Sequence, residues 1–139
     1  HLSIQISKIA IIDKTIVAFS IMVGKALEAA EALSSIGIEA EVIDLRSMRP
    51  LDTETILASV KKTGRMISCE EGFPFAGIGA ELAMQVMDGA FDYLDAPVMR
   101  VTGKDVPMPY AANLEKLALP QADDIVAAAR KACYRNQGG

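Results

Sequence analysis

Short apolar stretches alternate with stretches of helical periodicity along the chain, and this alternation limits the fold more than any other feature. Five stretches read as strands: Ile4–Ile12, Thr15–Phe19, Ile38–Leu45, Arg65–Cys69 and Val98–Thr102. Strands that alternate with helices pair in parallel through right-handed crossovers, and the helices cover both faces of one sheet. The sequence therefore predicts an α/β fold.

Four helices are expected between and after these strands. The second is the best marked, because Asp52 can cap its start, Lys61 and Lys62 fall in its last turn, and Gly64 follows. The others are expected over about 23–33, over 77–87 and after Pro120, with apolar residues at helical spacing.

The first two predicted strands are separated only by a turn at Asp13 and Lys14. A connection this short joins antiparallel strands. The first strand is therefore expected to pair with the second and to lie at an edge of the sheet.

Composition narrows the class of protein. A chain of 139 residues, 51% of them hydrophobic, is expected to form one folded domain. The net charge of −4 and the lack of a basic stripe argue against nucleic-acid binding. The longest uncharged run, Thr15–Gly24, is far shorter than the roughly 20 residues of a membrane helix. No signal or transit peptide is recognised, and a start at His1 leaves room for a natural N-terminus upstream.

Residues able to do chemistry are few. Glu70 and Glu71 are adjacent carboxylates, but neighbours on a strand point to opposite faces, so a structural role is favoured over a contact at a subunit interface. Cys69 and Cys133 lack metal-ligand spacing and are expected to be buried or idle thiols in a reducing compartment. His1, the only histidine, is assigned no role. No catalytic, cofactor-binding or metal-binding residue is therefore predicted, and the chain alone is not expected to be a catalyst.

Two stretches could hold a small ligand. GIGAEL (77–82) resembles the start of a dinucleotide loop but lacks its third glycine, so close packing of a helix start is favoured over a weak anion site. Asp44, Arg46 and Arg49 end a strand, where α/β sheets bind ligands. A local ion pair is the favoured interpretation there, and a small-anion site is the alternative.

Aromatic and acidic residues gather between positions 91 and 110, in FDYLDAPVMRVTGKDVPMPY. Aromatic anchors beside carboxylates on a proline-stiffened segment suit protein docking better than chemistry. Met84 and Met87 precede this segment on the third helix; core packing is the default expectation for them and an adaptable partner surface the alternative.

Three stretches carry a family resemblance: EVIDLRSMRPLDTETILASVKKTGR, EEGFP and FDYLDAPVMRVTGKDVPMPYAANLEKLALPQ. Together they closely resemble the C-terminal, transketolase-like domain of the β subunits of the pyruvate dehydrogenase decarboxylating component. The resemblance covers about Thr15 to Arg135 and implies a three-layer α/β/α domain with a five-stranded mixed sheet whose first strand is antiparallel. The domain is expected over residues 1–135, with a flexible tail over 136–139. The start, ISKIAIIDKTIV, is shorter than the family's hairpin, and Phe75 stands where a polar residue is usual.

The resemblance also implies a function for the whole enzyme. In the family, the α subunit and the N-terminal half of the β subunit hold thiamine diphosphate and magnesium, and that half carries the catalytic histidine. The enzyme decarboxylates pyruvate and transfers acetyl to a lipoyl group of the core acyltransferase. The implied location is the mitochondrial matrix, with the bacterial cytoplasm as the alternative.

The partners implied by the resemblance are an α subunit and a second β subunit in an α2β2 tetramer, and the subunit-binding domain of the acyltransferase. Asp95 matches the family acid that meets basic residues of that domain. The partner-binding residues expected from this match and its surroundings are Phe91, Tyr93, Asp95, Arg100, Asp105 and Tyr110. Two alternatives are a stand-alone assembly module derived from this domain and the equivalent domain of a branched-chain 2-oxo acid dehydrogenase.

Overall fold

The protein is described by a computed structural model covering residues 3–6, 12–47, 49–72, 77–103 and 119–134. The strands are β1 (Ser3–Ile6), β2 (Lys14–Ala18), β3 (Ala40–Leu45), β4 (Met66–Cys69) and β5 (Met99–Val101). The helices are α1 (Met22–Ser35), α2 (Thr53–Thr63), α3 (Ile78–Ala90), the short 3-10 helix η1 (Phe91–Tyr93) and α5 (Ala122–Tyr134). In these residues no helix is long and apolar enough to span a membrane.

The strands form one sheet in the order β1-β3-β2-β4-β5. The pairs β2–β3, β2–β4 and β4–β5 are all parallel, which confirms the predicted α/β class. β1 lies at the edge and runs antiparallel to β3, with Ser3 opposite Leu45 and Ile6 opposite Val42.

The first strand is antiparallel and lies at an edge of a five-stranded sheet, as predicted, but the expected pairing with the second strand is wrong. β2 has β3 on one side and β4 on the other, so both of its hydrogen-bonding edges are already occupied by parallel strands. The first strand therefore adds to the outer edge of β3. Lys14, expected in the turn, is the first residue of β2 and is fully buried.

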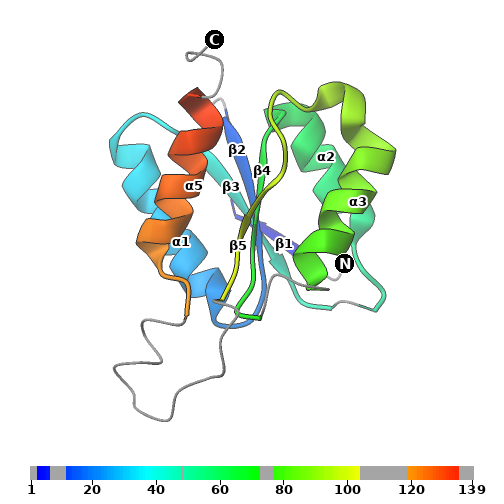
Figure 1. The fold of residues 1–139 in the computed structure, drawn as a ribbon, viewed down its shortest axis with the longest axis horizontal. Helices are drawn as coiled ribbons and strands as arrows, with labels where there is room; N and C mark the ends of the chain where they lie inside the picture. Colours follow the sequence, from blue (N-terminus) through cyan, green and yellow to red (C-terminus); the bar gives the residue numbers. More distant parts are fainter. Residues whose placement is uncertain (1–2, 7–11, 48, 73–76, 104–118, 135–139) are drawn as a thin grey trace.

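Helices cover both faces of the sheet, with α1 and α5 on one side and α2 and α3 on the other (Figure 1). Successive residues of β2 point to opposite faces, so Ile16 and Ala18 join one core while Val17 joins the other. On the α1–α5 side the helices present small residues such as Ala26, Ala29 and Ala129. On the other side Ile56 and Val60 of α2 pack with Leu82 and Val86 of α3, among others.

Helix α2 begins and ends where its capping residues predict. The Asp52 carboxylate accepts hydrogen bonds from the Thr55 backbone N–H at 3.3 Å and from the Thr55 hydroxyl at 2.7 Å. Gly64 ends the helix in the left-handed conformation, and its N–H donates to the Val60 carbonyl at 2.7 Å. The position of this last turn matters because the candidate site is attached to it.

Candidate docking surface

The loop after η1 is anchored to the end of α2. The Asp95 backbone N–H donates to the Gly64 carbonyl at 2.8 Å. A Cβ atom at position 64 would clash with the Asp95 carboxylate, with its Cγ only 2.9 Å away, and the φ of +70° at this position also favours glycine. The loop carrying Asp95 can approach α2 this closely because residue 64 has no side chain.

The aromatic residues beside Asp95 are exposed. Phe91 is 60% exposed and Tyr93 is 52% exposed. The ammonium group of Lys61, from the last turn of α2, lies 5.5 Å from the centre of the Tyr93 ring, which is a cation–π contact. The expectation that these aromatics would be available on the surface is consistent with this geometry.

Met84 and Met87 lie on the outer side of α3, so the default expectation of core packing is wrong for both. Met84 is 64% exposed and Met87 is 47% exposed. The buried stripe of α3 is formed instead by Gly79, Leu82, Val86 and Ala90. At 3.6 residues per turn, Met84 falls on the opposite side of the helix from this stripe, and Met87 falls about a quarter turn from it.

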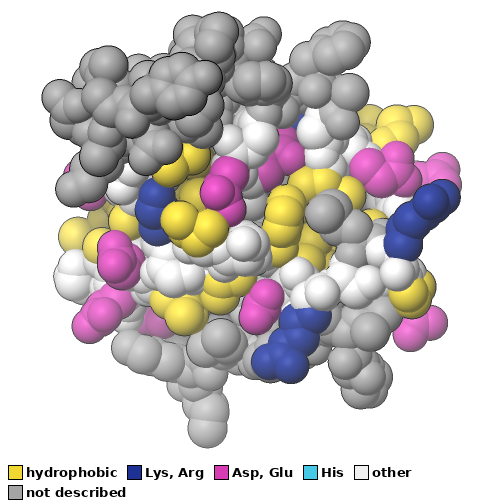
Figure 2. Space-filling view, turned by 90° about the horizontal axis from the view of Figure 1, so that it is seen from below, with side chains coloured by type: hydrophobic (Ala, Val, Ile, Leu, Met, Phe, Trp, Pro, Cys, Tyr) yellow, Lys and Arg dark blue, Asp and Glu magenta, His cyan; other side chains and the backbone are white. Residues whose placement is uncertain are grey.

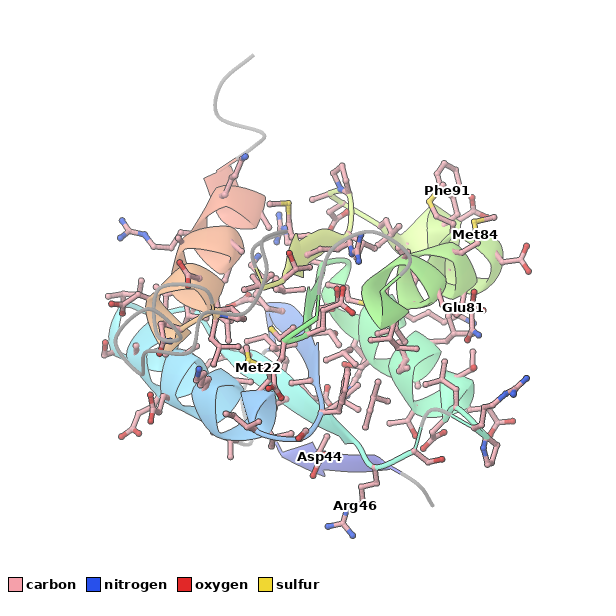
Figure 3. All side chains as sticks on the ribbon, turned by 60° about the horizontal axis from the view of Figure 1, so that its bottom comes forward. Met22, Asp44, Arg46, Glu81, Met84 and Phe91 are labelled. Atoms are coloured by element: carbon pink, nitrogen blue, oxygen red, sulfur yellow. The ribbon has the colours of Figure 1, made fainter. Side chains whose placement is uncertain are left out.

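Exposed carboxylates accompany these apolar side chains. Glu81 and Asp88 lie on α3, Asp92 lies on η1, and Asp95 lies two residues after the end of η1; all four are exposed. Figure 3 shows Glu81, Met84 and Phe91 along the outer side of this part of the molecule. We call this surface the α3–η1 face, formed by Glu81, Met84, Met87, Asp88, Phe91, Asp92, Tyr93 and Asp95.

The charged residues that α3, η1 and the following loop contribute to the α3–η1 face are all acidic. The sequence contains no Lys or Arg between positions 66 and 99, but it contains six Asp or Glu residues there. Among them, Glu70 is buried and paired with Arg100. The other Lys and Arg residues lie elsewhere along the chain, with Lys61 at the border of the face.

Glu70 holds the start of α3 against the sheet. Its side chain is 3% exposed, Oε1 accepts a hydrogen bond from Arg100 Nη2 at 2.6 Å, and Oε2 accepts one from the Gly79 N–H at 3.1 Å. The favoured structural role of Glu70 is therefore confirmed. The guanidinium of Arg100 is bound inside the domain, which gives no support to the docking role expected from its sequence neighbours.

The same contact explains the GIGAEL stretch. A Cβ atom on Gly79 would lie 2.7 Å from Arg100 Nε and 2.8 Å from Ser68 Oγ, so close packing requires glycine there. This confirms the packing interpretation. The Gly79 N–H, a donor that an anion at the start of α3 would use, already binds the Glu70 carboxylate, so the geometry gives no support to the anion-site alternative.

The other candidate ligand position lies where β2 and β3 end. Arg46 Nε is 3.9 Å from Asp44 Oδ2, which is the local ion pair that the sequence favoured. A shallow pocket of about 330 Å³ adjoins it and is lined by Phe19, Ser20, Asp44, Leu45, Arg46 and Ser47. Arg49 is exposed and does not line the pocket. Seen from this end, acidic, basic and hydrophobic side chains of the described residues are interspersed, without a cluster of cations (Figure 2).

Cys69 is a buried free thiol, as predicted. Burial, and secondarily the charge of Glu70, raise the pKa of Cys69 from 9.0 to about 12. Within the part of the chain that the structure describes, no three His, Cys, Asp or Glu side chains are grouped so that they could hold a metal ion. His1, Asp105, Tyr110 and the side chain of Cys133 lie outside the described residues.

A buried polar cluster on α2 escaped the sequence reasoning. Glu41 of β3 contacts Ser59 and Lys62 of α2, and Thr15 of β2 contacts Ser59 and Thr63. One signal was available, because Glu41 alternates with Ile43 and Leu45, which point into the core under α2 and α3. An acid at an inward position of a strand indicates a buried polar contact.

Comparisons with known proteins place this fold in a family. The family described as "Transketolase, C-terminal domain" matches residues 12–125. The chain therefore belongs to the transketolase C-terminal domain family. Within it, the chain resembles β subunits of the pyruvate dehydrogenase E1 component, as the sequence motifs predicted.

Two of these relatives illustrate the similarity. The mitochondrial β-1 subunit of rice (Oryza sativa subsp. japonica) is 65% identical over 123 residues, which are 88% of this chain and 33% of the relative. The β subunit of Rickettsia bellii is 62% identical over 120 residues, which are 86% of this chain and 37% of the relative. The chain thus spans about a third of the length of these curated relatives.

Solved structures agree with this fold. An inactive β4 tetramer of a split-gene transketolase has a TM-score of 0.77 and 34% identity, covering 92% of this chain and 40% of that one. The 2-oxoglutarate:ferredoxin oxidoreductase of Magnetococcus marinus has a TM-score of 0.64 at 14% identity, covering 94% of this chain and 19% of that one. At that identity the second likeness concerns the fold alone.

Proposed function

We propose that this chain is the C-terminal assembly domain of the β subunit of a thiamine-diphosphate-dependent pyruvate dehydrogenase. The complete enzyme decarboxylates pyruvate and transfers the acetyl group to the lipoyl group of the core acyltransferase. The identity of 65% to a curated β subunit over 88% of the chain supports this assignment.

The role of this domain in that enzyme is docking. The observation that carries the proposal is the α3–η1 face, where exposed methionines and aromatics alternate with four exposed carboxylates and the surrounding sequence lacks cations. Apolar anchors supply affinity, and a field of one sign selects and steers a partner of the opposite sign. The partner that fits is a basic surface with apolar contacts, which the subunit-binding domain of the acyltransferase is proposed to present.

Thiamine diphosphate and magnesium are assigned to the rest of the enzyme. The described residues offer no grouped metal ligands, and the position most like a phosphate-binding turn is filled by Glu70. These residues do not fit the cofactor, so no chemical step is assigned to them. The proposed partners are an α subunit and a second β subunit, which together form an α2β2 tetramer.

Mitochondrial and bacterial relatives are both similar to this chain, and the mitochondrial matrix is the proposed location because the plant mitochondrial subunits show 60–65% identity.

The alternative of a stand-alone assembly module makes a different prediction. The intact mass of the natural protein would then be near the 14.8 kDa of this chain. A mass more than twice as large would instead indicate a complete β subunit.

The docking role is tested with Asp95→Ala in the complete β subunit assembled with its α subunit. Calorimetric titration with the acyltransferase's subunit-binding domain should show a dissociation constant raised about tenfold, since one interfacial charge contact is lost. Glu28→Ala is the matched control, because Glu28 is an exposed acid on α1, on the opposite side of the sheet. Equal affinity of the Asp95 variant and the unaltered enzyme would exclude Asp95 from docking.

A further inference from the structure

The carboxylate of Glu41 is buried in the domain, and its counterion is an exposed lysine, Lys62. Its side chain is 1% exposed, whereas that of Lys62 is 54% exposed, and Lys62 Nζ lies 3.0 Å from Glu41 Oε2. The same oxygen accepts a hydrogen bond from Ser59 Oγ at 3.0 Å. When a buried carboxylate loses its counterion, its desolvation is no longer compensated. Removing the charge of Lys62 should therefore destabilise the fold more than breaking a surface ion pair would.

Hydroxyl groups extend this contact to the last turn of α2. Ser59 Oγ lies 2.7 Å from Thr15 Oγ1, which in turn lies 2.8 Å from Thr63 Oγ1. The Thr63 hydroxyl donates to the Arg65 carbonyl at 3.0 Å, and the Thr15 backbone N–H donates to the same carbonyl at 2.9 Å. Because Ser59, Lys62 and Thr63 all belong to α2, the cluster fixes the end of this helix against β2 and β3.

The end of α2 is also the attachment point of the loop after η1. Gly64, directly after Thr63, accepts the Asp95 N–H at 2.8 Å and packs against the Asp95 carboxylate. Lys61, directly before Lys62, contacts the Tyr93 ring. A shift of this turn therefore moves two residues of the α3–η1 face, although Glu41 itself contacts Ser59 and Lys62 of α2 and not that face.

We infer that Lys62 is a positioning residue for the docking loop. Its positive charge compensates the buried Glu41, the compensated cluster holds the last turn of α2, and that turn holds Tyr93 and Asp95 in place. The docking part of this inference rests on the proposed function. The positioning part rests only on the contacts within the domain.

The test compares Lys62→Gln with three matched variants in the complete β subunit assembled with its α subunit. Lys62→Arg keeps the charge. Lys131→Gln removes the same charge from an exposed lysine of α5, on the other side of the sheet from α2. Glu41→Gln combined with Lys62→Gln removes the need for a counterion, because a neutral amide can still accept from Ser59. The readouts are hydrogen exchange of the Asp95 amide and affinity for the subunit-binding domain.

Lys62→Gln should speed exchange of the Asp95 amide about tenfold or more and weaken docking in parallel. Lys62→Arg and the double variant should restore slow exchange, and Lys131→Gln should leave the Asp95 amide unchanged. Unchanged exchange at Asp95 in Lys62→Gln would overturn the positioning role. Equal acceleration throughout the α1–α5 side would overturn it as well, because it would indicate a loss of global stability.

A third result separates the two proposals. Faster exchange at Asp95 with full docking affinity would uphold the positioning of the loop by Lys62. The same result would contradict the docking function assigned to that loop.

Discussion

The close approach of the loop after η1 to the end of α2 depends on Gly64. It ends α2 with a φ of +70°, accepts the Asp95 N–H at 2.8 Å, and leaves space for the Asp95 carboxylate. A side chain at this position is disfavoured both by the backbone conformation and by the neighbouring loop. Sequence reasoning placed Gly64 as a helix end but could not show that a distant segment packs on it.

Gly64→Ala should lower the free energy of unfolding by about 1–3 kcal/mol, because a left-handed alanine is strained and its Cβ displaces Asp95. Urea denaturation measures the change. Gly24→Ala is the control, since Gly24 lies in α1 with nothing within 4 Å of an added Cβ, and alanine there should stabilise by about 0.5–1 kcal/mol. Equal effects of the two substitutions would contradict the role assigned to Gly64.

Cys69 makes stability depend on pH in the alkaline range. Burial raises its pKa from 9.0 to about 12, so the folded protein keeps the thiol proton at a pH where the unfolded chain loses it. The stabilising preference for the protonated thiol is complete below pH 9 and is progressively lost as the pH rises toward 12. Denaturation at pH 8 and pH 10.5 should show a smaller alkaline loss of stability in Cys69→Ala than in the unaltered protein. An identical loss in both would contradict the raised pKa.

At the scale of elements, Glu70 and Arg100 join α3 to β4 and β5. Glu70 directly follows β4, Arg100 lies on β5, and the Gly79 N–H at the start of α3 binds the same carboxylate. This buried pair sets the distance between helix and sheet. It also explains why Gly79 has no room for a side chain.

Arg100→Met should cost about 3 kcal/mol of stability, because it leaves the buried Glu70 carboxylate without its counterion. Adding Glu70→Gln should recover part of that loss, since a neutral amide can still accept from the Gly79 N–H. Thermal unfolding of the single and double variants measures this coupling. Additive losses in the double variant would show that the pair is not coupled.

Helices were predicted more reliably than strand partners. The capping residues of α2 mark its ends locally, so Asp52 and Gly64 identified them without tertiary information. The partner of β1 depends on which edges of β2 are free, and that is decided by strands far along the chain. Met84 and Met87 were misplaced because apolar character alone does not fix which side of a helix faces the core.

At the scale of the whole molecule, charge is unevenly distributed. The chain has a net charge of −4, but positions 66–99 contain six acids and no Lys or Arg, so the rest of the chain carries a small positive excess. Four of these acids are exposed on the α3–η1 face. The sequence alone shows this asymmetry of charge, but which of the acids are exposed became evident only from the folding of α3 and η1.

An acidic face should steer a basic partner, so association should slow as ionic strength rises. Between about 0.05 and 0.5 M salt the association rate constant of the assembled enzyme with the subunit-binding domain should fall by about tenfold or more, since screening shortens the range of the field. Asp88→Asn combined with Asp92→Asn should flatten this dependence, because both charges lie on the α3–η1 face. Glu28→Gln with Glu31→Gln on α1 changes the net charge equally and should leave the slope nearly unaltered. Stopped-flow measurement gives the salt dependence of the association rate constant for the unaltered enzyme and the two double variants. The same dependence in all three would mean that the partner approaches another surface. The docking function would then have to be assigned elsewhere on the domain.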